Sequence, residues 1–272
     1  MKRIAHKILR KPFFGRFETP WHWPKDISQD GWDRVEFKNA KGVKLVGYWK
    51  NAVAPIGTLV LAHPMGKAAK GFWLRYGHAE LFLKNNFNVF LFDANGFGES
   101  EAASFDYPAD FLAAGIYAKN KVPNLDVGLV GASFGGAWGL CSMAREGSPY
   151  TTAILEAVFP TLPDFWKHYP IAHTAIQASK IIWPSIERDL RPIEEASRLL
   201  GQPNIMLIYG DSDIYTPPSH GEKLSHAMRN AANVEMHVIS GGKHTYIYRD
   251  QPDEYIKYVL PFLKKSFTKP SE

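Results

Sequence analysis

The stretch that decides the fold is residues 126–136, "DVGLVGASFGG". The apolar run 127–130 is typical of a short buried strand, and residues 137–144 are typical of a helix, so Ser133 lies at a strand-to-helix turn. Gly131, Ser133 and Gly135 form the pattern G-x-S-x-G. A nucleophilic serine must project from a sharp, strained turn, and side chains at the flanking positions would collide with the neighbouring strand and helix. The stretch therefore predicts a serine that can act as a nucleophile.

The rest of the chain alternates between strand and helix patterns. A hairpin is expected over 35–37 and 43–49, followed by strands at 57–62, 88–93, 126–130, 151–155, 204–209 and 234–239. Helices are expected at about 73–86, 107–120, 134–146, 217–231 and 252–266. This alternation predicts a doubly wound α/β fold whose sheet is mainly parallel and buried on both faces. In such folds ligands bind beyond the carboxyl ends of the strands.

One segment interrupts the alternation. Residues 159–200 are aromatic, rich in proline and long for a connection, which predicts a lid or binding element of short helices. The alternative is a group of helices that packs the edge of the sheet. The expected organisation is a basic N-terminal arm over 1–31, one α/β domain over 32–266 that contains this insertion, and a short tail over 267–272.

A serine nucleophile needs a base, and the base needs an orienting acid. The run 204–209 is followed by Asp211 and Asp213, and the run 234–239 is followed by a Gly-rich loop that holds His244. The order Ser133, Asp213, His244 is that of a Ser-Asp-His triad on an α/β sheet. Asp213 is favoured over Asp211 because its greater distance from the strand suits a side chain that must reach a neighbouring loop.

Other histidines compete for the role of base. His237 falls inside a predicted strand, and His220 and His226 fall on a predicted helix, where a packed or solvated histidine is the ordinary case. His63 and Pro64 follow the strand 57–62 and can be explained as a turn that ends it. His244 is therefore the expected base.

Backbone N–H groups must bind the oxyanion that forms during acyl transfer. One donor is expected to be the amide of Phe134, the residue after the nucleophile. The other is expected to be the amide of Met65, in the loop "HPMGKAAKG" after the strand 57–62. The walls of the substrate pocket are expected to include Trp138, Phe159, Trp166 and Tyr215, and Phe165 and Tyr246 also lie on or near segments expected to border it. No metal or organic cofactor is required, since the chain has no HExxH, CxxC or P-loop pattern.

Residues 32 to 266 resemble the α/β-hydrolase superfamily, and within it the small serine aminopeptidase-like hydrolases and related bacterial esterases. The segments that carry the resemblance are "LVLAHPMG", "VFLFDANGFGES", "VGLVGASFGG", "PNIMLIYGDSDIYTPP" and "ISGGKHTY". The family usually has His-Gly where this chain has His63-Pro64, which weakens the assignment of the second oxyanion donor, Met65. Asp93 and the glycines after it match a segment that implies structure at the floor of the site.

The expected activity is hydrolysis of a carboxylic ester with an apolar acyl or aromatic group through an acyl-enzyme intermediate. Acyl transfer or thioester cleavage on the same triad is the alternative, because it differs only in what resolves the acyl-enzyme. A non-catalytic ligand-binding protein would have no need of all three triad residues. The expected partner is a small-molecule ester, and the sequence does not determine the oligomeric state.

Charge and cysteine content restrict the remaining possibilities. The chain of 272 residues has a net charge of +5, but six basic residues precede the first acidic one, so the rest is close to neutral. We therefore expect no nucleic-acid partner. The basic arm is interpreted as a solvated or packed segment, and the alternative is contact with an anionic membrane surface. The single cysteine, Cys141, excludes an internal disulfide and is expected to pack in a helix. The N-terminal arm has no uninterrupted apolar run of the kind found in secretory signals. A reducing cytoplasm is therefore the expected location.

Overall fold

The computed structural model describes residues 15–17, 19–170, 173–174, 176–177 and 191–268. Within these residues one eight-stranded sheet has the order β1-β2-β4-β3-β5-β6-β7-β8. β1 pairs with β2, and β2 with β4, in antiparallel fashion, and all other pairs are parallel. The strands are β1 (Asp33–Lys38), β2 (Lys44–Lys50), β3 (Gly57–Ala62), β4 (Phe87–Phe92), β5 (Val127–Ala132), β6 (Tyr150–Glu156), β7 (Asn204–Gly210) and β8 (Asn233–Ile239).

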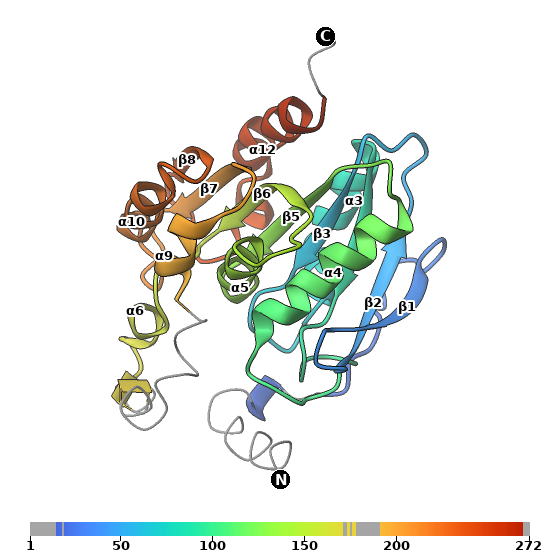
Figure 1. Cartoon of the computed structure of the whole chain (residues 1–272), viewed down its shortest axis with the longest axis horizontal. Coiled ribbons are helices and arrows are strands. Elements are labelled where there is room, and N and C mark those ends of the chain that lie inside the picture. The colour runs from blue at the N-terminus through green and yellow to red at the C-terminus, as the bar shows by residue number, and fades with distance from the viewer. Residues whose placement is uncertain (1–14, 18, 171–172, 175, 178–190, 269–272) are drawn as a thin grey trace.

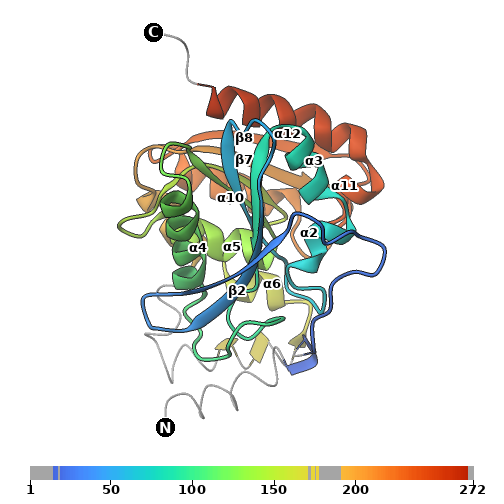
Figure 2. The same ribbon diagram turned by 90° about the vertical axis from the view of Figure 1, so that its right-hand side faces the viewer.

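Helices cover both faces of the sheet (Figure 1). One face carries α4 (Tyr107–Lys121), α5 (Phe134–Met143) and α10 (Pro218–Met228), and the other carries α2 (Gly71–Arg75), α3 (His78–Lys84), α11 (Ile247–Asp250) and α12 (Pro252–Phe267). Figure 2 shows α4 and α5 on one side of the sheet and α2, α3 and α11 on the other. The fold is therefore the doubly wound, mainly parallel α/β sheet that the sequence predicts.

The sheet separates two hydrophobic cores because successive side chains of a strand point to opposite faces. In β4, Phe90 and Phe92 belong to the core beneath α4 and α5, whereas Val89 and Leu91 belong to the core beneath α2, α3 and α12. The central strands are buried along their whole length, as expected for strands covered on both faces.

The predicted strand ends agree with the structure to within two residues. The predicted helix 73–86 is instead two helices, α2 and α3. They are separated at Gly77, whose φ of 78° lies in the left-handed region that a continuous helix excludes. Helix α5 ends at Met143, three residues earlier than expected.

The ends of the chain and the insertion are described in part. Residues 1–14 of the predicted basic arm, on which the membrane interpretation depends, lie outside the described residues. After η1 (Gly15–Phe17), Trp21, Trp23 and Ile27 pack against the α2/α12 face. In the insertion, α6 (Leu162–Trp166) is followed by α9 (Pro192–Glu195) and η2 (Ala196–Arg198), while residues 171–172, 175 and 178–190 lie outside the described part.

Candidate active site

Ser133 lies at the turn between β5 and α5, with φ 49° and ψ −113°. A non-glycine residue pays for this backbone conformation, and it persists only where its surroundings hold it. The Ser133 N–H donates to the carbonyl of Glu156 at 2.8 Å, and the Ser133 carbonyl accepts the N–H of Ala137 at 2.9 Å. Both hydrogen bonds fix the turn to β6 and to the first turn of α5.

The glycines of the motif are explained by close packing. A Cβ on Gly131 would lie 2.6 Å from the Cα of Gly136, and a Cβ on Gly135 would overlap the carbonyl of Ala62 at the end of β3. A side chain at either position would push α5 away from the sheet. The requirement inferred from the sequence, that the flanking residues lack side chains, is therefore met for a specific steric reason.

Ser133, His244 and Asp213 form one hydrogen-bonded chain. The Nε2 of His244 lies 3.0 Å from the Oγ of Ser133, and its Nδ1 lies 2.7 Å from Oδ2 of Asp213. The side chain of Asp213 is fully buried, whereas that of His244 is 23% exposed toward the cavity. This is the arrangement in which an imidazole can take a proton from a serine hydroxyl while a carboxylate orients the ring.

The environment of Asp213 keeps it ionised. Burial alone would raise its pKa, but the hydrogen bond and charge of His244, together with hydrogen bonds from Thr216, hold that pKa below its ordinary value. The N–H groups of Tyr215 and Thr216 donate to Oδ1 at 2.9 and 3.1 Å. Asp211 instead accepts the N–H of Gly241 at 2.7 Å and ties the two loops together, so Asp213 is the acid that reaches the histidine.

Contacts between the two loops set the spacing of acid and base. The N–H of Ser212 donates to the carbonyl of Gly242 at 3.1 Å. A Cβ on Gly210 would overlap that same carbonyl, and a Cβ on Gly242 would lie 2.8 Å from the Cα of Gly210. The loop that carries Asp213 and the loop that carries His244 can approach each other only because both positions are glycine.

The rival histidines lie elsewhere. His220 is buried on α10, where burial lowers its pKa to about 4, His226 is exposed on the same helix, and His237 stacks on Tyr258 from β8. His63 is fully buried, and its pKa is lowered by that burial. Its Nε2 accepts the N–H of Ala94 at 3.1 Å and its Nδ1 contacts the carbonyl of Pro64 at 2.9 Å, so it is a neutral structural link.

Met65 and Phe134, the two predicted oxyanion donors, border the nucleophile. Both line a small pocket of about 10 Å³ that also includes Ser133. Within the described residues the N–H of Met65 donates no hydrogen bond, which leaves it available to a ligand. Pro64, the departure from the family pattern, forms the turn through its carbonyl and does not displace Met65 from the site.

A larger cavity of about 420 Å³ opens in front of Ser133 and His244. Aromatic residues dominate its walls: Phe17, Phe72, Tyr76, Phe165, Tyr169, Tyr215 and Tyr246. Among its described lining residues Lys67 is the only lysine, and none is an aspartate or glutamate. The described walls therefore suit apolar and aromatic groups and present no carboxylate to a cationic one.

The predicted pocket residues have different positions. Tyr215 lines the large cavity, and Phe159 and Trp166 line the small pocket beside Ser133. Trp138 lines neither: it is 1% exposed and packs against Tyr107 and Phe159 within the core. Its predicted place in the pocket wall is wrong, because one helical turn further along α5 than Phe134 its ring is enclosed by core residues.

The sequence interpretation missed four wall residues: Phe17, Phe72, Tyr76 and Tyr169. Phe72 and Tyr76 are four residues apart shortly after the Met65 loop, and this spacing on one helix face was the available signal. Nothing local distinguishes Phe17, since it reaches the site only through the path of the chain. Within the described residues no group of three or more metal-binding side chains occurs.

The sheet order, the serine turn and the triad geometry together define an α/β hydrolase. The prolyl oligopeptidase family (Peptidase_S9) matches residues 108–270, and the chain belongs to this family. The resemblance inferred from the sequence motifs is thus confirmed at the level of the superfamily.

Within the described residues no helix is both long and apolar enough to cross a bilayer.

Solved structures with the same fold have low sequence identity to this chain. An esterase from Pyrococcus furiosus is 18% identical, with a TM-score of 0.73 over 91% of this chain and 97% of its own. A predicted CIB-like hydrolase from Thermoplasma acidophilum is 15% identical, with a TM-score of 0.60 over 86% and 100%. An acylaminoacyl peptidase from Pyrococcus horikoshii is 14% identical, with a TM-score of 0.64 over 89% of this chain and 43% of its own. Among curated proteins, none matches the sequence.

Proposed function

We propose that the protein is a serine hydrolase that cleaves carboxylic esters with apolar acyl or aromatic groups through an acyl-enzyme intermediate. The observation that carries the proposal is the hydrogen-bonded chain from Ser133 through His244 to the buried Asp213. A carboxyl ester presents one acyl group and one alcohol leaving group, and the aromatic cavity beside Ser133 has the size of a small-molecule site.

In the proposed reaction Ser133 Oγ attacks the ester carbonyl as His244 Nε2 takes the hydroxyl proton. The carbonyl oxygen becomes an oxyanion that the amides of Met65 and Phe134 stabilise. His244 then donates the proton to the departing alkoxide, which leaves as an alcohol. A water molecule attacks the acyl-enzyme by the same steps in reverse, and the products are a carboxylic acid and free Ser133.

The direct test uses p-nitrophenyl esters from acetyl to palmitoyl, with fluorophosphonate labelling as a second readout. The wild-type protein should hydrolyse some of the series and accept the label, and Ser133→Ala should lose both. Equal hydrolysis rates in the two proteins, or persistent labelling of Ser133→Ala, would contradict the proposal. Added alcohols or thiols separate hydrolysis from acyl transfer, because a transferase forms new esters or thioesters in their presence.

Peptide hydrolysis is the second candidate, and family membership favours it. The described walls of the large cavity hold no carboxylate to pair with a free peptide amino terminus, which supports the ester over an unblocked peptide. Matched substrates with the same acyl group, one a p-nitrophenyl ester and one a p-nitroanilide, discriminate the two. If the p-nitroanilide is cleaved faster than the p-nitrophenyl ester, the protein acts on peptide substrates instead.

A further inference from the structure

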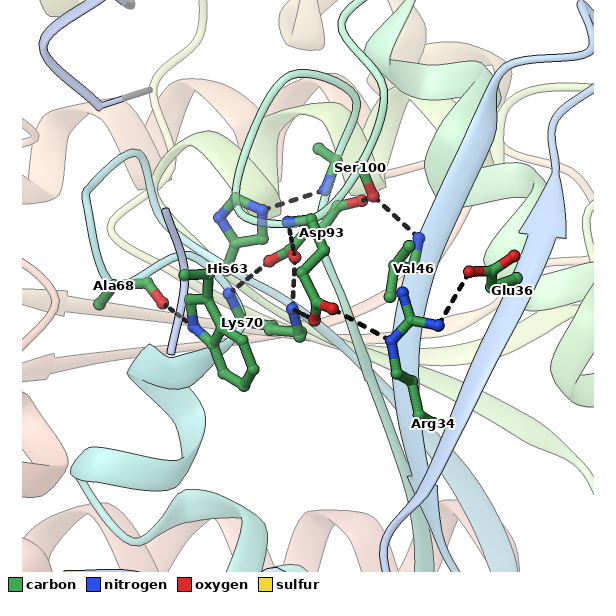
Figure 3. Close-up of polar contacts among 11 residues, drawn as sticks. Arg34, Glu36, Val46, His63, Ala68, Lys70, Asp93 and Ser100 are labelled. Atoms are coloured by element: carbon green, nitrogen blue, oxygen red, sulfur yellow. Dashed lines mark hydrogen bonds and ion pairs between the residues drawn. The ribbon is translucent and has the colours of Figure 1, made fainter. Parts of the chain in front are cut away.

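The two ends of the loop that carries Met65 are tied to two adjacent residues, Asp93 and Ala94. At the start of the loop, His63 accepts the N–H of Ala94. At its end, the N–H of Lys70 donates to Oδ1 of Asp93 at 3.0 Å. Asp93 and Ala94 directly follow β4, so the end of this strand holds the loop over residues 63–70, here called the oxyanion loop (Figure 3).

Lys70 is fully buried and its ammonium group is surrounded. It lies 2.5 Å from Oδ2 of Asp93 and 2.8 Å from Oε2 of Glu99. Arg34 reaches Glu99 from the solvent side at 3.0 Å and also pairs with Glu36 (Figure 3). Burial by itself would raise the pKa of Glu99, but the hydrogen bonds and charges of Lys70 and Arg34 lower it.

Such a cluster is weak support for stability, since the cost of burying charges offsets much of their attraction. The cluster instead restricts the position of the loop, because two carboxylates and one ammonium group can lie at hydrogen-bond distance in only a few arrangements. Gly98 contributes to this arrangement, because a Cβ at this position would overlap the carboxylate of Asp93. The segment after β4 therefore packs closely around the carboxylate of Asp93, which pairs with Lys70.

The remaining side of Lys70 is covered by a residue from the N-terminal segment. The ring of Trp21 lies 3.6 Å from the Lys70 ammonium, a cation–π contact. The indole N–H of Trp21 also donates to the carbonyl of Ala68 at 3.1 Å. Trp21 therefore contacts the oxyanion loop twice, once through its ring and once through its N–H.

The backbone between these two contacts is strained. Ala69 has φ 48°, in the left-handed region that residues with a side chain seldom adopt. Conformations of this kind persist only when neighbouring contacts impose them, and they concentrate at functional sites. Here the hydrogen bond at Ala68 and the ion cluster at Lys70 bracket the strained residue.

We infer that Trp21, acting on Ala68 and on the buried Lys70–Asp93–Glu99 cluster, is a positioning residue that fixes the oxyanion loop so that the amide of Met65 faces Ser133. The inference rests on the proposed function and deepens it. The N-terminal segment is thereby part of the active site in two ways, since Phe17, four residues before Trp21, lines the cavity. A misplaced oxyanion donor weakens the transition state more than the bound substrate.

The test compares Trp21→Phe with Trp23→Phe. Trp23 is a matched control because it lies in the same segment and packs on Tyr48 as Trp21 does, but its indole N–H donates to Ile27 and not to the oxyanion loop. Both substitutions keep an aromatic ring. We expect Trp21→Phe to lower kcat about 10-fold with KM changed less than twofold, in line with a shifted donor. Trp23→Phe should leave both constants within twofold.

Two further readouts exclude a merely structural effect. A trifluoromethyl ketone with the acyl group of the best substrate should bind Trp21→Phe about 10-fold more weakly, in parallel with kcat/KM. Amide hydrogen exchange of the peptide 63–70 should accelerate in Trp21→Phe but not in Trp23→Phe. Equal kcat in the two variants, or unchanged exchange in the peptide 63–70, would overturn the inference.

Gly71→Ala approaches the same contact from the other side. Its new Cβ would lie 3.0 Å from the indole Nε1 of Trp21, so it should displace the N–H from Ala68 and reduce kcat in the same way. Combined with Trp21→Phe, it should add less than a twofold further loss, because both act on one contact. Fully additive losses would contradict the inference. If the wild-type protein cleaves no ester and accepts no fluorophosphonate, the proposed function fails, and hydrogen exchange alone then decides whether Trp21 holds the loop.

Discussion

The carbonyl of Glu156 accepts the N–H of Ser133 at 2.8 Å, and the carboxyl group of the same residue is buried immediately behind the triad. Its Oε1 accepts the N–H of Ile247 at 3.4 Å, and its Oε2 has no partner among the described residues. Burial raises the pKa of Glu156 to about 7, and the charge of Asp213 adds to the effect. The end of β6 thus supports the nucleophile with its backbone, and the side chain of Glu156 takes up a proton as the pH falls below about 7.

This proton predicts a pH dependence of stability. The pKa of Glu156 in the folded protein is raised, so the folded state binds more protons than the unfolded chain between about pH 4.5 and 7, and stability falls as pH rises through this window. Glu156→Gln removes the effect. Its free energy of unfolding relative to wild type should therefore increase by about 3 kcal/mol from pH 4.5 to pH 7.5, as judged from the size of the pKa shift.

Urea unfolding of both proteins at several pH values measures this difference. Asp110, a buried carboxyl whose pKa is raised to about 6, acts in the same direction in both proteins and cancels in the comparison. If burial of the glutamine amide destabilises the variant, it does so equally at every pH. The plot of the difference in unfolding free energy against pH would then shift as a whole without a change of slope. A difference between the two proteins that does not vary with pH would show that Glu156 is already ionised at pH 5.

Asp213→Asn should nearly abolish activity while the protein stays folded. An asparagine cannot hold His244 in the tautomer that accepts the Ser133 proton, and in comparable triads this change lowers kcat by about 10⁴. Asp211→Asn is the matched control, because its oxygen can still accept the N–H of Gly241. Ester hydrolysis and the rate of fluorophosphonate labelling should fall only in the first variant, and a comparable loss in the second would reassign the acid.

Gly135→Ala should destabilise the fold strongly. The added Cβ would overlap backbone atoms at the end of β3, which cannot move as a flexible side chain could. Gly147→Ala is the comparison: it has nothing within 4 Å and carries only the backbone cost of φ 77°, about 1 kcal/mol. Thermal unfolding should show a much larger decrease in Tm for Gly135→Ala. Similar decreases in the two variants would mean that α5 can move away from β3 at little cost.

Phe165→Ala should shift the preferred ester toward longer acyl chains. Phe165 lines both the large cavity and the small pocket beside Ser133, and its ring lies 6.0 Å from that of His244. Removing its ring should connect the large cavity with the small pocket and leave more room for an acyl chain. Trp138→Phe should lower Tm and leave the chain-length profile unchanged, because Trp138 lies in the core. The rates across the p-nitrophenyl series decide this, and a changed profile in Trp138→Phe would restore Trp138 to the pocket wall.

Local sequence patterns were sufficient to predict features that depend only on residues close together in the chain. The strand before Ser133, the glycines around it and the order of acid and base follow from periodicity and from the steric needs of one turn. Trp138 and Phe17 mark the limit of such reasoning. Whether a large aromatic residue packs in the core or borders a cavity depends on which neighbours cover it, and those neighbours are distant in the chain.

The sequence by itself determined that this protein has a doubly wound sheet, a strained serine turn, and an aspartate and a histidine that follow later strands. Only the tertiary structure decided that Asp213 and not Asp211 reaches His244, which aromatic residues form the cavity, and that Trp21 contacts the oxyanion loop 47 residues away at Ala68. The physical reason is range: strand and turn preferences act between neighbours along the chain, whereas these contacts form only after the sheet brings distant segments together.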